Sequence, residues 1–132
     1  MIADIQPMKS ILIAEGDRHV ASLFAMVFSR SDWKVASSGD AHRAIEAIRG
    51  TEHFDVVLVS YNVPGTNGVE LTRLVRSLEH RKDTPVVMVT GRTGIEVEAL
   101  RAGASEVLSK PVDISKLVAA VSKYVSGPGY RK

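Results

Sequence analysis

Cysteine is absent from the 132 residues, which excludes a disulfide framework, a thiolate metal site and a cysteine nucleophile. Long apolar runs are missing too, because none approaches the roughly 18 residues of a membrane-spanning helix. Residues 1–9 have neither the charge pattern nor the apolar core of a signal peptide. We therefore expect a cytoplasmic location and no membrane partner.

An excess of charge of one sign is also lacking. The chain has 17 Lys and Arg residues against 15 Asp and Glu residues, and the two kinds are interspersed. Direct nucleic-acid binding usually needs a basic stripe on one face of a domain. The only terminal bias is the pair Arg131 and Lys132, which we interpret as a solvated tail. We expect no direct contact with nucleic acid.

The composition is that of an ordinary globular domain, with 45% hydrophobic and 24% charged residues. A chain of this length usually forms one domain and can bury a sizeable core. We expect a single domain over residues 1–132, with its core at about residues 10–126 and short flexible termini.

Short apolar runs alternate with amphipathic stretches along the whole chain, which indicates an α/β fold. Continuous apolar strands separated by helices are typical of a parallel sheet covered on both faces, and right-handed crossovers make it a doubly wound (βα)5 sheet. The expected strands are 11–14, 33–37, 55–59, 85–90 and 107–108. The expected helices cover 20–28, 41–48, 71–78, 95–102 and 114–125.

Polar residues follow several of these strands where the strands end. In an open parallel sheet these ends meet at one edge, where such folds place their chemistry. The most informative residue is Ser60, a hydroxyl at the end of the third strand, where the surroundings suggest a carboxylate that could be phosphorylated. The residues expected at this edge are Glu15, Gly16, Asp17, Ser60, Asn62, Thr90 and Lys110.

Four motifs follow one another in a specific order and spacing. They are the loop Asn62-x-Pro64-Gly65-x-x-Gly68, then Thr90-Gly91, Gly103-Ala104 and Lys110-Pro111. From about Ser10 to Val125 the chain resembles the receiver domain of response regulators, which act in two-component (phosphorelay) signal transduction. The resemblance implies a flavodoxin-like fold with strand order 2-1-3-4-5 and a cis Lys110–Pro111 peptide bond.

The resemblance also assigns roles at the sheet edge. Receiver domains hold Mg²⁺ with an acidic pair after the first strand, and the positions of that pair correspond to Glu15 and Gly16. The position of their phosphoacceptor Asp corresponds to Ser60. Contacts to the phosphoryl group fall on Thr90 and Lys110, which are retained, and the switch aromatic falls on Val107. The chain departs from the pattern at Gly16, Ser60 and Val107, so it resembles an atypical receiver, or pseudo-receiver, that lacks the phosphoacceptor.

Magnesium prefers several hard oxygen ligands in octahedral geometry. Only Glu15 and a backbone carbonyl at Asn62 remain to supply them, so we expect no cofactor and weak or absent Mg²⁺ binding. Asp17 lies nearby, but it directly precedes the first helix and is expected to be its N-cap.

The hydroxyl of serine is a weak nucleophile without a base to activate it. We therefore expect no enzymatic activity, and we expect Ser60 to fill the vacated pocket and to form a hydrogen bond with Lys110 or Thr90. An unpaired buried ammonium would be costly, so we predict a contact between Lys110 and Glu15. Positive φ angles in turns would explain Gly65 and Gly68.

The leading functional hypothesis is a phosphorylation-independent interaction module. Its partner would be a signalling protein, either a histidine kinase or a downstream effector, docked on the face formed by residues 95–102, 107–108 and 114–125. One alternative is a phosphotransfer-competent receiver that uses Ser60 or Asp17 as acceptor. Another is a sensor in which Lys110, Thr90 and Arg92 hold a small anion or nucleotide. Both a monomer and a homodimer are compatible with the sequence. So are a free-standing domain and a part of a longer protein.

Overall fold

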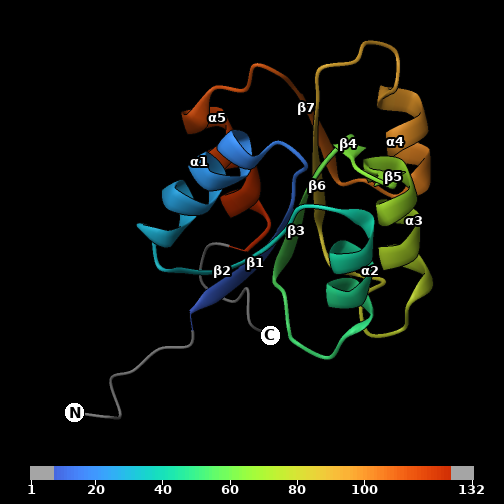
Figure 1. The fold of residues 1–132 in the computed structure, drawn as a ribbon, viewed down its shortest axis with the longest axis horizontal. Helices are drawn as coiled ribbons and strands as arrows, with labels where there is room; N and C mark the ends of the chain where they lie inside the picture. Colours follow the sequence, from blue (N-terminus) through green and yellow to red (C-terminus); the bar gives the residue numbers. More distant parts are fainter. Residues whose placement is uncertain (1–7, 126–132) are drawn as a thin grey trace.

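The structure is a computed structural model that describes residues 8–125. Five parallel strands form one sheet in the order β2-β1-β3-β6-β7 (Figure 1), which confirms the predicted flavodoxin-like order. The strands are β1 (Lys9–Ala14), β2 (Trp33–Ser38), β3 (Val56–Ser60), β6 (Val86–Thr90) and β7 (Glu106–Ser109). The helices are α1 (Arg18–Ser29), α2 (Ala41–Arg49), α3 (Gly68–Ser77), α4 (Glu96–Ala102) and α5 (Ile114–Lys123).

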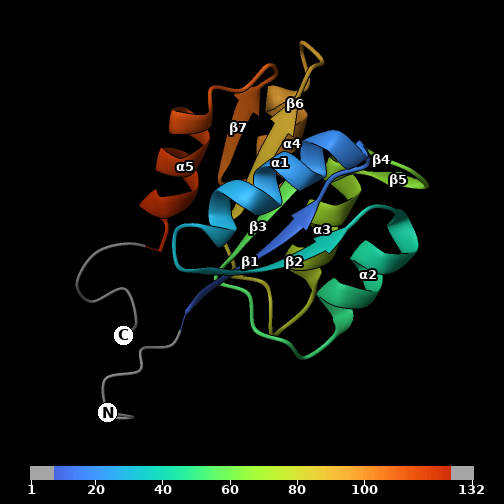
Figure 2. The same ribbon diagram turned by 60° about the vertical axis from the view of Figure 1, so that its left-hand side comes forward.

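Helices cover both faces of the sheet, with α1 and α5 on one side and α2, α3 and α4 on the other (Figures 1 and 2). Successive side chains of a strand point to opposite faces, so β1 serves two cores. Ile11 and Ile13 belong to the core that includes Phe28, whereas Leu12 and Ala14 belong to the core that includes Val75. Burial on both faces explains the continuous apolar runs of the central strands β1, β3 and β6.

The third strand lies one residue later than predicted, at Val56–Ser60 rather than 55–59. Asp55 precedes it, and the carboxylate of Asp55 accepts a hydrogen bond from the Ser10 amide, 2.8 Å away. The shift matters for the site, because Ser60 is the last residue of the strand and pairs with Val89 of β6.

The segment predicted as a plain loop after Ser60 contains a small antiparallel hairpin, β4 (Asn62–Val63) and β5 (Thr66–Asn67). Gly65 turns it with a φ of 88°, as expected. The prediction of a positive φ at Gly68 was wrong. This residue is constrained by close approach instead, since a Cβ atom there would lie 2.7 Å from the carbonyl oxygen of Ser60.

Polar side chains and one buried cation fix the helix ends. The predicted N-cap Asp17 accepts hydrogen bonds from the amides of His19 and Val20 at 2.9 and 3.0 Å. The buried Arg81 donates to the carbonyls of Ala47, Ile48 and Gly50 at the end of α2. These contacts satisfy backbone groups that have no partner inside a helix.

Residues 1–7 and 126–132 lie outside the described residues. Two predictions fall there: the flexible termini and the solvated tail of Arg131 and Lys132. Within residues 8–125, no helix has the length and apolar character needed to cross a membrane.

Candidate functional site

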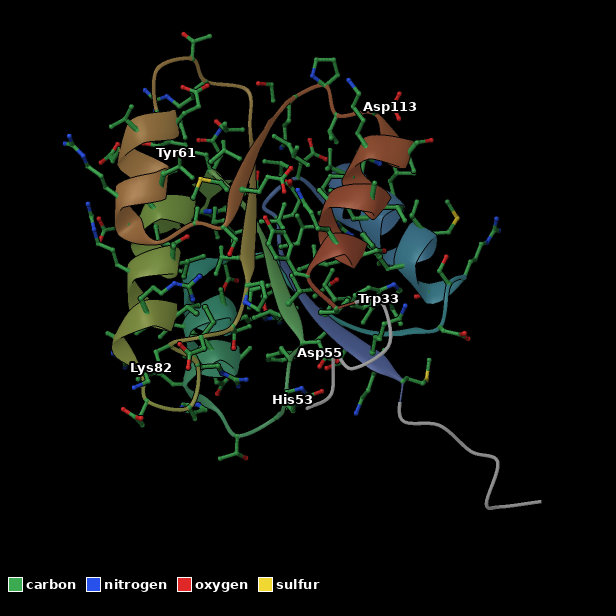
Figure 3. All side chains as sticks on the ribbon, turned by 180° about the vertical axis from the view of Figure 1, so that it is seen from behind. Trp33, His53, Asp55, Tyr61, Lys82 and Asp113 are labelled. Atoms are coloured by element: carbon green, nitrogen blue, oxygen red, sulfur yellow. The ribbon has the colours of Figure 1, made fainter. Side chains whose placement is uncertain are left out.

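The candidate site lies at the carboxyl edge of the sheet, beyond the ends of β1, β3, β6 and β7. Glu15 follows β1, Ser60 ends β3, Thr90 ends β6, and Lys110 follows β7. Figure 3 shows Tyr61, the residue after Ser60, and Asp113 toward this end, with His53 and Asp55 toward the opposite end. The parallel strands thus bring together residues that are far apart in the sequence.

Lys110 bridges two elements of this edge. Its Nζ atom donates to Glu15 Oε1 and to Ser60 Oγ, each at 3.1 Å. The side chain of Glu15 is only 3% exposed and that of Lys110 is 28% exposed. The predicted Lys110–Glu15 contact is confirmed, and of the two predicted partners of Ser60 the structure selects Lys110.

The second carboxylate oxygen of Glu15 is also engaged. Glu15 Oε2 accepts a hydrogen bond from the backbone amide of Asp17 at 2.9 Å. The carboxylate of Asp17 is turned to the helix, and the hydrogen bond from the Val20 amide, followed by that from His19, lowers the pKa of Asp17. Asp17 is therefore the predicted N-cap, and both oxygens of Glu15 have donors.

Gly16 lies under the β4–β5 hairpin, a contact that sequence reasoning missed. A Cβ atom on Gly16 would lie 2.6 Å from Cδ of Pro64 and 3.1 Å from the carbonyl oxygen of Asn62. The carbonyl of Pro64 accepts a hydrogen bond from the amide of Ala41 at 2.8 Å, which ties the hairpin to the start of α2. The position of the second acidic residue in the receiver pattern is therefore filled by the Pro64 ring.

These residues do not fit a divalent metal. Glu15 is the only carboxylate in the Lys110 bridge, Gly16 has no side chain, and the hydroxyl of Ser60 is neutral. In residues 8–125 no group of three or more His, Asp or Glu side chains is placed to hold a metal ion. Asp17 also lines the pocket, but its carboxylate already accepts the amides of His19 and Val20, which leaves few free oxygen ligands of the kind Mg²⁺ prefers.

Thr90 and Arg92 form a separate part of the edge. The hydroxyl of Thr90 accepts a hydrogen bond from the amide of Arg92 at 3.0 Å. The guanidinium of Arg92 lies 4.9 Å from the centre of the Tyr61 ring, in a cation–π contact. Tyr61 is half-buried and packs against the core on the α2–α3–α4 side.

Val107 lies half-buried on β7, paired with Met88 of β6. The neighbouring helix α4 exposes two large apolar side chains, Val97 and Leu100, which are 59% and 52% exposed. Exposed apolar side chains that gather on one face can mark an interaction site. Helix α4 packs against β7, the edge strand of the sheet, and Tyr124 at the end of α5 binds Glu106 of β7, so the three elements of the predicted docking face lie next to one another.

The sequence of residues 11–122 matches the family model described as the response regulator receiver domain. The chain belongs to this family. Receiver domains are signalling modules of two-component systems, and they interact with histidine kinases and downstream effectors.

Curated relatives of the receiver domain include two bacterial regulators. The chain is 26% identical over 125 residues to the phosphate regulon transcriptional regulatory protein PhoB of Pseudomonas aeruginosa, covering 92% of the chain and 54% of PhoB. It is 31% identical over 113 residues to the DNA-binding response regulator MtrA of Mycobacterium tuberculosis, covering 84% of the chain and 48% of MtrA. The chain thus spans about half the length of these relatives.

Solved receiver structures share the fold. A CheY-like receiver domain protein from Methanospirillum hungatei superposes with a TM-score of 0.82 at 26% identity, covering 89% of this chain and 93% of that one. The receiver domain of the sensor histidine kinase PA1611 from Pseudomonas aeruginosa gives a TM-score of 0.80 at 20% identity, with coverages of 89% and 97%. That PA1611 structure has a magnesium ion coordinated in its active-site cleft.

Proposed function

We propose that this receiver domain is an atypical one that signals without phosphorylation, by binding another protein. The observation that supports this most is the Lys110 bridge to Glu15 and Ser60. A protonated lysine can only donate hydrogen bonds, so Lys110 gives the hydroxyl of Ser60 no base. Ser60 therefore lacks the activation that a serine nucleophile requires.

The proposal extends to metal and partners. Because Gly16 supplies no carboxylate and Asp17 is engaged as the N-cap, Mg²⁺ binding should be weak or absent. The partner would be a histidine kinase or a downstream effector that docks on the face of α4, β7 and α5, where Val97 and Leu100 are exposed. A cytoplasmic location and the absence of direct contact with nucleic acid or membrane are part of this proposal.

The two alternatives receive less support from the geometry. Asp17 as a substitute acceptor would have to leave its N-cap position, where its side chain accepts two backbone hydrogen bonds. A small-anion or nucleotide sensor would need Lys110 and Arg92, and both already have partners, in the bridge and over the Tyr61 ring.

Incubation with a small phosphodonor and Mg²⁺ tests the proposal, with intact-mass analysis as the readout. We expect no phosphorylated species, while a receiver that retains its acceptor Asp serves as the positive control. An acid-stable adduct that disappears in Ser60→Ala would contradict the proposal. So would an acid-labile adduct, lost on hydroxylamine treatment and absent in Asp17→Asn.

A further inference from the structure

The pocket at the sheet edge contains a nearly fully buried carboxylate with one cation beside it. Glu15 is 3% exposed, and its Oε1 atom accepts a hydrogen bond from the ammonium of Lys110. A buried carboxylate is strongly disfavoured unless a cation and hydrogen bonds compensate for the lost water. Lys110 supplies that cation, and the amide of Asp17 supplies the hydrogen bond to Oε2.

The space around this pair is closed to further ligands on one side. The ring of Pro64 lies where a side chain at residue 16 would project, and the carbonyl of Pro64 is held by the amide of Ala41. No second carboxylate can therefore join Glu15 from that position without a shift of the hairpin.

The charge of Glu15 matches one monovalent cation. Glu15 and Lys110 form a neutral contact pair, and the second carboxylate that lines the pocket, that of Asp17, accepts the amides of His19 and Val20. A divalent ion that entered beside Lys110 would place three positive charges against the two carboxylates of Glu15 and Asp17, and the repulsion between ion and ammonium would oppose binding. The Lys110 ammonium therefore competes with a divalent ion for Glu15.

We propose that the ammonium of Lys110 is the resident cation of this pocket and stands in place of a divalent metal. The folded pocket then depends on the Lys110–Glu15 pair and is independent of metal. This inference rests on the proposed function in one respect, because both exclude Mg²⁺ chemistry in the pocket. It adds a structural role for Lys110, which applies with or without a bound partner.

The variant Lys110→Met tests the charge separately from the packing. The stem of Lys110 also lines an apolar groove with Leu23 and Phe24 of α1 and with Val112. Methionine keeps an unbranched stem for that contact and removes only the ammonium. Glu15→Gln removes the opposite charge and keeps an oxygen that can accept the Asp17 amide.

A double-mutant cycle in metal-free buffer measures the coupling by urea unfolding. We expect each single variant to lower the folding equilibrium constant by roughly tenfold or more, because Lys110→Met leaves the buried carboxylate of Glu15 uncompensated and Glu15→Gln leaves the partly buried ammonium of Lys110 without its carboxylate. The double variant should lose clearly less than the product of the two effects. Lys116→Met, an exposed lysine of α5, is the matched control and should change little.

Additive losses in the cycle would overturn the inference and leave the proposed function standing. If Lys110→Met alone does not fold, recovery of folding in the double variant supports the inference, and an equally unfolded double variant overturns it. The unmodified protein should show no saturable rise in melting temperature with MgCl₂ or MnCl₂ beyond that of NaCl at equal ionic strength. Such a rise would overturn the inference, since a ligand that binds the folded state stabilises it. Phosphodonor labelling, by contrast, tests the proposed function alone.

Discussion

At the scale of single residues, Gly16 has a tightly constrained environment at the site. A Cβ atom would approach Cδ of Pro64 to 2.6 Å, and the Ala41 amide holds the carbonyl of Pro64. We expect Gly16→Ala to lower the free energy of unfolding by about 1–3 kcal/mol, the usual cost of overpacking. Urea unfolding followed by circular dichroism measures this change.

Gly39→Ala is the control for that experiment. A Cβ atom on Gly39 would meet only the carbonyl oxygen of Glu15, at an ordinary 3.9 Å. This variant should change the free energy of unfolding by less than about 0.5 kcal/mol. A loss in Gly16→Ala as small as that expected for Gly39→Ala would show that Pro64 yields to a methyl group and that the hairpin does not close the pocket.

Some residue contacts of the site were predictable from the sequence and others were not. The Lys110–Glu15 pair followed from the cost of an unpaired ammonium among a few residues at strand ends, and the N-cap role of Asp17 followed from its position before a helix. The Gly16–Pro64 approach depends on how the β4–β5 hairpin folds back toward α2. Local sequence carries no signal for such a long-range approach, nor for Arg81, whose partners are backbone carbonyls.

At the scale of elements, a polar cluster ties β7 to the end of α5. Glu106 accepts hydrogen bonds from Lys123 Nζ at 2.8 Å and from the hydroxyl of Tyr124 at 3.0 Å. The hydrogen bond from Lys123 lowers the pKa of Glu106, and the same bond raises the pKa of Lys123. Burial, followed by the Glu106 contact, raises the pKa of Tyr124.

The pH dependence of this cluster follows from these directions. Because the folded pKa of Glu106 is below its ordinary value of 4.5, its stabilisation is present above that value and is lost as the pH falls through the folded pKa. Glu106→Gln should therefore be less stable than the unmodified protein near neutral pH. We expect a difference of about 0.5 kcal/mol or less, since the pair is partly exposed.

Urea unfolding at a series of pH values measures that difference, which should shrink toward zero in acid. Glu46→Gln, at an exposed position on α2, should show a smaller and flatter difference. If the Glu106→Gln difference stays constant into acid, the effect comes from packing of the side chain and not from its charge.

The elements themselves were largely predictable, because the buried strands β1, β3 and β6 contain continuous apolar runs and the helices show 3.6-residue patterns. The β4–β5 hairpin was missed because strands of two residues, Asn62–Val63 and Thr66–Asn67, are too short to show any periodicity. The start of the third strand was predicted one residue too early. Asp55 adjoins the apolar run, but its carboxylate binds the backbone of Ser10.

At the scale of the whole molecule, the site and the proposed docking face adjoin each other, since Lys110 directly follows β7. If a partner docks on α4, β7 and α5, then Val97→Asp and Leu100→Asp should each weaken binding by about tenfold or more, because each puts a charge into an apolar contact. Biolayer interferometry against purified histidine kinases and effector domains measures this loss.

Leu23→Asp is the matched control on the opposite layer, because Leu23 is 41% exposed on α1. It should leave the affinity unchanged. A loss confined to Leu23→Asp would move the docking site to the face of α1, and unchanged affinity in all three variants would exclude both apolar patches.

The Gly16–Pro64 contact also bears on how a second acidic residue beside Glu15 could be obtained by selection. A library that samples residues 16 and 60 one at a time would meet a barrier, because a carboxylate side chain at 16 collides with the hairpin while Pro64 is in place. The fitness effect of a change at 16 should thus depend on the identities of residues 62–65. A directed-evolution search would succeed only by varying these positions together.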